Sequence, residues 1–321
     1  MQEACLNLLN AAAYLIEGSF AKYFSGFMPL LTNIVVSVES KTQEQMQLRA
    51  RAMESMGVLI VSVADNQEFL GTVQEVTQSL FGLLQQGFAE DDPQELAVKD
   101  TLAKVAFYLK GDFNAVAPQF LAILLKDASA EVKVDVNAGV LPNSVADKNT
   151  IDIKIRGLED VQRFSLNTGE LEQKIAAFNH IMKVASAMGR SFEPHIPAVL
   201  PILTAHMSNT SRTLRKYALK TFQHLLTAQG EPANVALFGT IYEHFAMCIL
   251  KAKKDNNVKE MKLLYKELCH CLNVIGENEE PANRMPLAAD KLRTFAAVMK
   301  TCLDAVTQQT QEARLAIDEK Q

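Results

Sequence analysis

The stretch Lys110-Gly111-Asp112-Phe113, with Phe120 and Leu124 after it, decides the fold. Its first three residues form a turn segment between two apolar runs, and Phe113 follows the turn directly. Apolar residues stand seven and eleven positions after Phe113, and others stand eight and eleven positions before it. Such offsets belong to one face of an α-helix, so Phe113 is predicted to stand between two amphipathic helices.

The same pattern recurs around Phe20, Phe69 and Phe192, each of which follows a turn segment of its own. Successive anchors are 49, 44 and 79 residues apart (69 − 20, 113 − 69, 192 − 113), and the first two spacings lie close to those of helix-pair repeats. Pro29 and Pro201 both stand nine residues after their anchor, which indicates a shared bend in the following helix. The third spacing indicates an insertion.

These repeats predict an all-α fold, a right-handed α-α superhelix of the HEAT-repeat type. Residues 1–321 are expected to form a single solenoid of about six to seven helix pairs, incomplete at both ends. The first expected helix, Glu3 to Ile16, has no preceding partner, and the last, Leu287 to Ile317, has no clear successor. Each repeat should bury an apolar stripe of its second helix. The stripes are Met53, Met56, Ile60 and Val63; Val98, Leu102, Val105, Ala106 and Leu109; and Leu171, Ile175, Phe178, Met182 and Ala185.

Residues 129–168 form the expected insertion, because they interrupt the helical rhythm. Val132–Val136 and Ile151–Ile155 alternate apolar and polar residues, as half-buried strands do, and the segment between them resembles a loop. One interpretation is a β-hairpin of these two strands, and the other is a partly ordered loop.

Composition excludes several classes of function. The chain carries 32 basic and 37 acidic residues, a formal net charge of −5, so no overall field attracts nucleic acid or an anionic membrane. The N-terminus lacks the positive charge of a signal peptide, and the apolar runs are too short for a membrane span. Five cysteines at irregular spacings indicate no disulfide framework. We expect a protein of the cytosol, without membrane insertion or direct nucleic-acid binding.

Catalytic and metal-binding patterns are weak in this sequence. It contains no nucleotide-binding glycine loop, nucleophile elbow or zinc-protease motif. Cys269-His270-Cys271 has no second cluster at zinc spacing, and Cys271 falls on an apolar stripe with Leu264 and Leu268. We therefore expect Cys271 to pack in the core, and we predict no enzyme activity, no cofactor and no metal.

Two charged segments are open to two interpretations each. The turn Ala89-Glu90-Asp91-Asp92-Pro93-Gln94 places acids before a helix start, where they can cap the helix or contact a basic ligand. Lys251-Ala252-Lys253-Lys254, followed by Lys259 and Lys262, indicates a solvated helix C-terminus, with contact to nucleic acid as the alternative.

Several strings between residues 20 and 205 occur in the order and spacing of a known family. They are Tyr23-Phe24 through Phe27-Met28-Pro29-Leu30; Glu90-Asp91-Asp92-Pro93-Gln94 with Leu109-Lys110-Gly111-Asp112-Phe113; and Phe164-Ser165-Leu166 with Gly169-Glu170-Leu171-Glu172-Gln173-Lys174. In these strings the chain resembles the importin-beta (karyopherin-beta) nuclear transport receptors, most closely the importin-5 (karyopherin-beta-3) branch. By this resemblance it would be a middle fragment of a longer receptor.

The resemblance implies a monomeric nuclear import receptor that shuttles through the nuclear pore between cytoplasm and nucleus. Its implied partners are protein cargo with basic import signals, Ran-GTP, and phenylalanine-glycine nucleoporins, which bind in grooves between outer helices. The alternative is a HEAT-repeat scaffold of a phosphatase or coat complex. Candidate protein-binding residues are acids opposite the buried stripes, in the acidic turn or at the end of the insertion: Glu54, Asp91, Asp92, Asp100, Glu159 and Asp160.

Overall fold

The computed structural model describes residues 2–89, 91–131, 134–138, 150–154, 161–166 and 168–280, with single positions 284, 293, 296, 297, 300 and 307. The chain divides into two compact units, Met1–Met188 and Gly189–Gln321, each described by itself below. A single solenoid over residues 1–321 stays a prediction. Most of the expected last helix, Leu287 to Ile317, lies outside the described residues.

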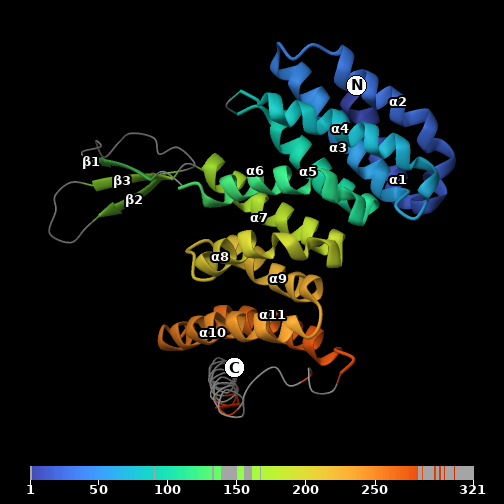
Figure 1. The fold of residues 1–321 in the computed structure, drawn as a ribbon. Helices are drawn as coiled ribbons and strands as arrows, with labels where there is room; N and C mark the ends of the chain where they lie inside the picture. The colour runs from blue at the N-terminus through green and yellow to red at the C-terminus, as the bar shows by residue number, and fades with distance from the viewer. Residues whose placement is uncertain are drawn as a thin grey trace, which may run out of the picture. The chain divides into compact units, whose positions relative to one another are not determined.

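The first unit is a two-layer array of helices (Figure 1). Its α-helices are α1 (Gln2–Ile16), α2 (Ala21–Ser37), α3 (Gln43–Ser62), α4 (Leu70–Gln86), α5 (Pro93–Leu109), α6 (Ala117–Ser129) and α7 (Thr168–Met188). Helices α1, α3, α5 and α7 pack side by side in chain order and form the stacked layer. Helices α2, α4 and α6 each pack on the stacked-layer helix that follows them, and they form the flanking layer.

Local sequence signals set the helix ends. Thr42 caps α3, because its Oγ1 accepts a hydrogen bond from the Gln45 backbone N at 3.2 Å while the Gln45 side chain accepts one from the Thr42 backbone N at 3.1 Å. Pro93 opens α5, where its missing N–H is of no consequence. Gly87 ends α4 at φ 80°, a conformation that glycine adopts without strain.

The four anchor phenylalanines occupy equivalent places. Each lies in a short 3-10 helix between two α-helices and is at most 7% exposed. The four 3-10 helices are η1 (Glu17–Phe20), η2 (Gln67–Phe69), η3 (Lys110–Ala115) and η4 (Gly189–His195). Pro29 and Pro201 both lie inside the helix that follows their anchor, α2 and α8 (Ile196–His206). The predicted register of the repeats is therefore confirmed.

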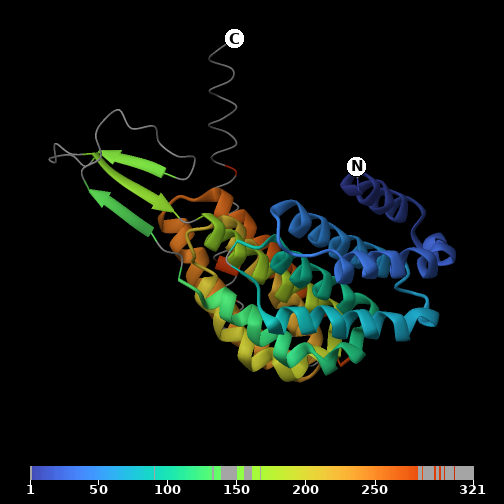
Figure 2. The ribbon, with the colours of Figure 1, turned by 90° about the horizontal axis from the view of Figure 1, so that it is seen from above.

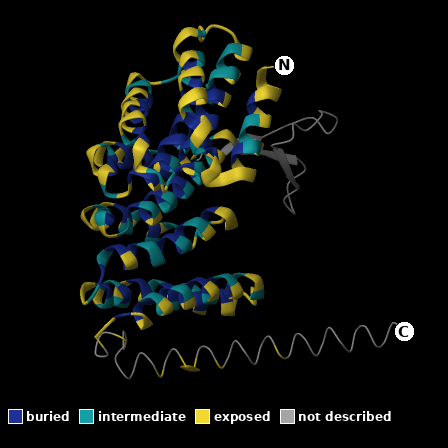
Figure 3. Cartoon of the chain, turned by 90° about the vertical axis from the view of Figure 1, so that its right-hand side faces the viewer, coloured by how far each residue is buried: buried dark blue, intermediate teal, exposed yellow. Residues whose placement is uncertain are grey.

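The stripes predicted for α3 and α5 are fully buried, whereas the one predicted for α7 is partly wrong. Phe178 and Ala185 are buried, but Leu171, Ile175 and Met182 are only half-buried. The core face of α7 turns toward both α5 and α6, which pack against it, so other residues are buried. These are Ala177, Ile181, Val184 and Met188. Helices of this chain carry both buried and exposed faces (Figure 3).

Three strands form the insertion between α6 and α7 (Figure 2). They are β1 (Val134–Ala138), β2 (Thr150–Lys154) and β3 (Val161–Leu166). Both predicted strands exist within about two residues of their expected bounds, but the predicted hairpin between them is wrong. Strand β3 lies in the middle, in the order β1-β3-β2, and pairs antiparallel with each neighbour. The hydrogen-bonding edges of β1 and β2 are satisfied by β3 rather than by one another.

The second unit contains α8, α9 (Arg212–Gln229), α10 (Ala233–Lys254) and α11 (Val258–Gly276) among its described residues. Helix α9 packs against η4, α8, α10 and α11. In the described part of the chain, α10 is the one helix long and apolar enough to cross a membrane. Its Phe238, Ile241 and Phe245 are nevertheless buried, and the Phe245 ring lies 5.9 Å from that of Phe222 in α9. This packing is typical of a core helix.

Candidate functional site

An acidic cavity lies where the N-termini of α5 and α7 meet the C-terminus of α6. Its volume is about 250 Å³. Five carboxylates line it, those of Asp91, Asp92, Glu95, Asp127 and Glu172. The other lining residues are Pro93, Leu96, Lys99, Gly169, Gln173, Ala176, Ala177 and His180. We call this site the acidic cavity.

The two aspartates of the acidic turn have different local roles. Asp92 caps α5, because its Oδ1 accepts a hydrogen bond from the Gln94 backbone N at 2.9 Å. The Gln94 side chain also donates to Asp92, and to Ser40 Oγ at 2.7 Å, which ties the turn to the loop between α2 and α3. Asp91 is exposed and has a φ of 61°, which aspartate tolerates better than most residues. Capping thus engages Asp92 and leaves Asp91 toward solvent.

Lys99 is the single cation among the lining residues, and two carboxylates engage it. Its Nζ donates to Glu95 Oε1 at 2.6 Å and to Asp127 Oδ2 at 2.7 Å, and its side chain is only 8% exposed. Burial alone would lower the pKa of Lys99, but the hydrogen bonds to Asp127 and Glu95 outweigh it and raise the pKa. This three-residue cluster joins α5 to α6.

The three remaining carboxylates of the cavity differ from Glu95 and Asp127 in their ion pairing. Neither Asp91, Asp92 nor Glu172 forms an ion pair with any residue in the described part of the chain. Their charges lie at the N-termini of α5 and α7, where the helix dipoles favour negative charge. The rim of the cavity is therefore a stable acidic surface that a cation can approach.

Asp100 lies further along α5 and is engaged by internal cations. Its carboxylate pairs with Lys104 Nζ at 2.7 Å and Lys183 Nζ at 2.7 Å, and it lies 3.5 Å from His180 Nε2. Burial would raise the pKa of Asp100, but the hydrogen bonds from His180 and Lys104 lower it far below its usual range. Asp100 therefore links α5 to α7, and its carboxylate is already engaged within the protein.

His180 is a buried polar residue among those that line the cavity. It is 2% exposed, and its Nδ1 has no hydrogen-bond partner among the described residues. Burial lowers the pKa of His180, and the neighbouring Asp100 carboxylate offsets this only in part. The imidazole is therefore neutral near pH 7. With the proton on Nε2, which faces Asp100, Nδ1 carries the lone pair and is itself buried.

Two of the six predicted site residues come together here. Asp91 and Asp92 line the acidic cavity, whereas Asp100 serves the α5–α7 link. Glu54 in α3 is outside the cavity lining and pairs with Arg51 at 2.7 Å. Glu159 and Asp160 lie outside the described residues.

Sequence reasoning missed Glu95, Asp127 and Glu172. The Glu95–Lys99 pair has the i,i+4 spacing of a helical ion pair, and this spacing was a usable signal. Asp127 and Glu172 are brought together only by the packing of α6 on α7, across the whole insertion. Nothing in the sequence near either residue indicates that contact.

A second surface is an apolar groove between α2 and α4 of the flanking layer. Its volume is about 640 Å³, and its lining includes Pro29, Val36, Met56 and Leu80. Val36 is 73% exposed, so it offers apolar surface in this groove. We call this the flanking groove.

The cysteine cluster of α11 behaves as predicted for Cys271. That thiol is fully buried, and burial raises its pKa to about 12, so it stays protonated and packs as a small apolar group. Cys269 is exposed. Among the described residues, no group of three or more histidine, cysteine or acidic side chains is placed to hold a metal ion.

The chain is similar to known proteins in sequence and in fold. Importin subunit beta-3 of Saccharomyces cerevisiae is 23% identical over 201 residues, which cover 62% of this chain and 18% of that protein. The structure of Kap121p bound to Nup53p matches with a TM-score of 0.73 and 19% identity, over 97% of this chain and 28% of that one. The structure of Kap121p bound to Pho4p matches with a TM-score of 0.73 and 18% identity, over 98% of this chain and 28% of that one. The chain has a karyopherin fold.

The predicted all-α helical-repeat class and the resemblance to the importin-beta family are thereby confirmed. No protein-family model matches the sequence. The karyopherin-like chain spans only about a fifth of the importin subunit beta-3 length and 28% of Kap121p. Its acidic cavity and flanking groove belong to one helical-repeat unit of that fold.

Proposed function

We propose that this chain is part of a nuclear import receptor and that its acidic cavity binds a basic segment of protein cargo. The observation that carries the proposal is the set of three unpaired carboxylates, Asp91, Asp92 and Glu172, at the mouth of one cavity. Three fixed negative charges around one opening favour a cation and repel acidic segments. No nucleotide or cofactor chemistry is needed, and the function is binding rather than catalysis.

The cavity suits one lysine or arginine side chain. A charged head that enters would meet the carboxylates at the rim, and the apolar stem would lie along Leu96 and Ala176. His180 is neutral near pH 7, so this lining residue adds no positive charge that would repel the entering cation. Residues of the cargo on either side of that anchor would run over the polar face of the stacked layer.

The flanking groove suits phenylalanine-glycine nucleoporins. Its exposed Val36 and Pro29 offer apolar surface between two outer helices, beside polar lining residues such as Asn33, and an aromatic ring can pack there. Kap121p, of the same fold, is known bound to Nup53p. The proposed occupant is a single phenylalanine of a nucleoporin repeat.

Ran-GTP is the proposed release signal, and cytoplasm and nucleus are the proposed compartments, with the chain acting as a monomer. Support comes from the fold shared with importin subunit beta-3 and Kap121p. The scaffold alternative, a subunit of a phosphatase or coat complex, predicts a partner complex that ignores nucleotide. A pulldown with the full-length parent, with and without Ran-GTP, separates the two: release of bound cargo supports the receptor and a constant complex supports the scaffold.

Fluorescence anisotropy with a labelled lysine-rich peptide tests the acidic cavity directly. Asp91→Asn, Asp92→Asn and Glu172→Gln together remove three charges while keeping the cap and the backbone conformation. We expect affinity to fall by about tenfold or more, since each lost charge pair is worth up to about 1 kcal/mol. The matched control removes three exposed acids elsewhere, with Glu44→Gln, Asp65→Asn and Glu68→Gln. Equal losses in both variants would reject the cavity as the binding site.

A further inference from the structure

The second unit carries a basic groove between the N-terminal halves of α9 and α11. Five cations line it: Arg212, Lys216, Lys259, Lys262 and Lys266. The one carboxylate among the lining residues is that of Glu267, which is 2% exposed. The groove has a volume of about 380 Å³, and Thr213 and Leu263 complete its lining. We call it the basic groove.

All five cations of the basic groove are exposed, and none of them forms an ion pair with a residue in the described part of the chain. Several other cations in the described chain do engage a carboxylate, among them Lys99, Lys104 and Arg215. Five like charges around one concavity repel each other, and they do so in a chain whose formal net charge is −5. Such a cluster is a positive surface set within an acidic protein.

Helix geometry adds to the positive charge. Arg212 is the first residue of α9, and Lys259 is the second residue of α11, so both stand where the helix dipole already presents partial positive charge. The expected solvated helix C-terminus holds for Lys251 and Lys254 in the last turn of α10, but not for Lys259 and Lys262. Cations at helix N-termini gain nothing from their own helix. They are better placed to meet an external anion.

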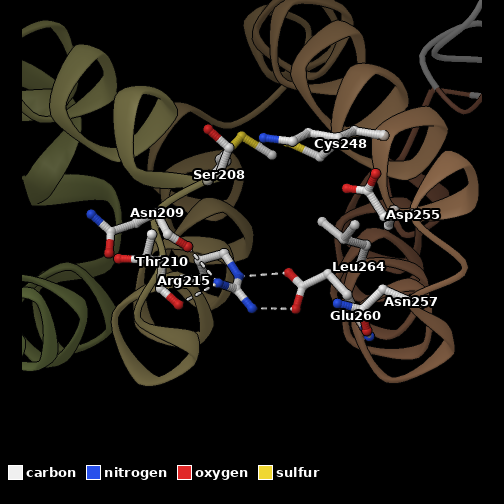
Figure 4. Close-up of a pocket in the computed structure, with 12 residues that line it drawn as sticks. Ser208, Asn209, Thr210, Arg215, Cys248, Asp255, Asn257, Glu260 and Leu264 are labelled. Carbon is white, nitrogen blue, oxygen red and sulfur yellow. Dashed lines mark hydrogen bonds and ion pairs between the residues drawn. The ribbon is translucent and has the colours of Figure 1, made fainter. Parts of the chain in front are cut away.

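One ion pair holds the two walls in place (Figure 4). Arg215 of α9 forms a bidentate pair with Glu260 of α11, with Nε to Oε1 at 2.7 Å and Nη2 to Oε2 at 2.5 Å. The same guanidinium also donates to the backbone carbonyls of Asn209 and Thr210, which fixes its position. Lys216 follows Arg215 in α9, and Lys259 precedes Glu260 in α11. The ion pair therefore ties together the two helix segments that carry these lysines.

We propose that the basic groove binds a short acidic peptide segment of a partner protein. From Lys259 to Lys266, α11 rises about 10 Å, a length that an extended peptide crosses in about three residues. The groove therefore fits three or four successive aspartate or glutamate residues, each within reach of a lysine or of Arg212. This partner has the opposite charge to the basic cargo proposed for the acidic cavity. The basic groove and the acidic cavity therefore bind different peptide segments.

Nucleic acid fits the groove less well than a peptide. The lining holds no aromatic side chain on which a base could stack. A long polyanion would also extend beyond five cations onto a chain of net negative charge. A short segment ends before it meets that repulsion, and the walls formed by Thr213 and Leu263 offer contact to a peptide backbone.

Anisotropy of the 321-residue chain with a fluorescein-labelled Gly-Glu-Glu-Glu-Glu-Gly peptide tests the proposal. We expect saturable binding that weakens as NaCl rises, and no binding of the matching glutamine peptide. Lys262→Glu with Lys266→Glu should weaken binding by about tenfold or more. The matched control, Lys253→Glu with Lys254→Glu, reverses two exposed charges outside the groove and should change affinity less than twofold.

Circular dichroism verifies that each variant is folded. If the charge reversal disturbs folding, Lys262→Gln with Lys266→Gln should give a milder loss of peptide affinity in the same direction.

Binding of a labelled 12-nucleotide oligo-dT tests the nucleic-acid alternative. Tighter binding of oligo-dT than of the acidic peptide overturns the proposal in favour of nucleic acid. Absence of saturable peptide binding, or equal loss in groove and control variants, overturns it outright. Binding of the lysine-rich peptide at the acidic cavity should be unchanged in the groove variants, so failure here leaves the cargo proposal standing.

Discussion

The Nζ of Lys99 in α5 lies 2.7 Å from Oδ2 of Asp127 in α6, and this contact joins two helices that also wall the acidic cavity. Asp127→Asn removes one of the two carboxylates of a nearly buried cation. We expect the free energy of unfolding to fall by roughly 1–2 kcal/mol, less than for a fully buried pair because Asp127 is 25% exposed and Glu95 remains. Urea denaturation followed by circular dichroism measures the change.

An exposed ion pair serves as the comparison for that prediction. Glu54→Gln breaks the Arg51–Glu54 pair, whose side chains are 53% and 35% exposed. It should change the free energy of unfolding by less than about 0.5 kcal/mol. If both substitutions cost the same, the Lys99 cluster contributes no more than a surface pair does.

Gly57 in α3 faces α5 at close range. A Cβ at this position would lie 3.0 Å from Cδ of Lys104 and 3.3 Å from Cα of Thr101, and the Thr101 backbone cannot move aside easily. Gly57→Val should therefore destabilise the fold by roughly 1–3 kcal/mol, despite the gain in helix propensity. Gly82→Ala in α4, where a Cβ meets nothing within 4 Å, should instead stabilise by about 0.5–1 kcal/mol. Thermal melting temperatures of the two variants should move in opposite directions.

Stability should fall as the pH drops from 7 to 5, in part because of His180. Burial lowers the pKa of His180 in the folded protein, so below about pH 6.5 the unfolded chain binds a proton that the folded chain does not. Asp100 does not titrate in this window, because its hydrogen-bond partners hold its pKa far below the usual range. Burial and Lys220 lower the pKa of His224 as well, which adds to the same trend. His180→Gln should make the slope of unfolding free energy against pH shallower by up to about 1.4 kcal/mol per pH unit, and an unchanged slope contradicts the assignment.

Val36 should matter for nucleoporin binding and little for folding. Val36→Ser removes two methyl groups from the flanking groove, where 73% of the residue is exposed. Affinity for a phenylalanine-glycine peptide should fall about fivefold, the equivalent of roughly 1 kcal/mol of lost apolar burial. Leu30→Ser, at a residue of α2 that is 60% exposed and does not line the groove, is the control. Isothermal titration calorimetry with both variants decides whether the groove is the contact.

Much of the fold could be predicted because it depends on the periodic spacing of apolar residues that are close in sequence. The anchors Phe20, Phe69, Phe113 and Phe192 all occupy the predicted inter-helix turns, since a turn followed by a fixed apolar offset needs no knowledge of distant residues. The face of α7 was misjudged by about one residue, because both α5 and α6 contact it and periodicity alone does not say which neighbours a helix has. Strand β3 was missed for a similar reason: its pairing with β1 and β2 is nonlocal.

The candidate site was harder to predict than the fold. Asp91 and Asp92 could be selected because they precede a helix and share one turn. Glu172 belongs to the cavity only because α7 returns to α6 after the insertion, and Lys259 faces Lys216 only because α11 packs on α9. Charges on separate helices become a site through packing, and a pattern read along the chain cannot show that.

The chain leaves the acidic cavity at the end of α6 and re-enters it at the start of α7, so the insertion connects two walls of one cavity. We therefore expect a change within that segment to act first on the cavity and only then on the helical repeats.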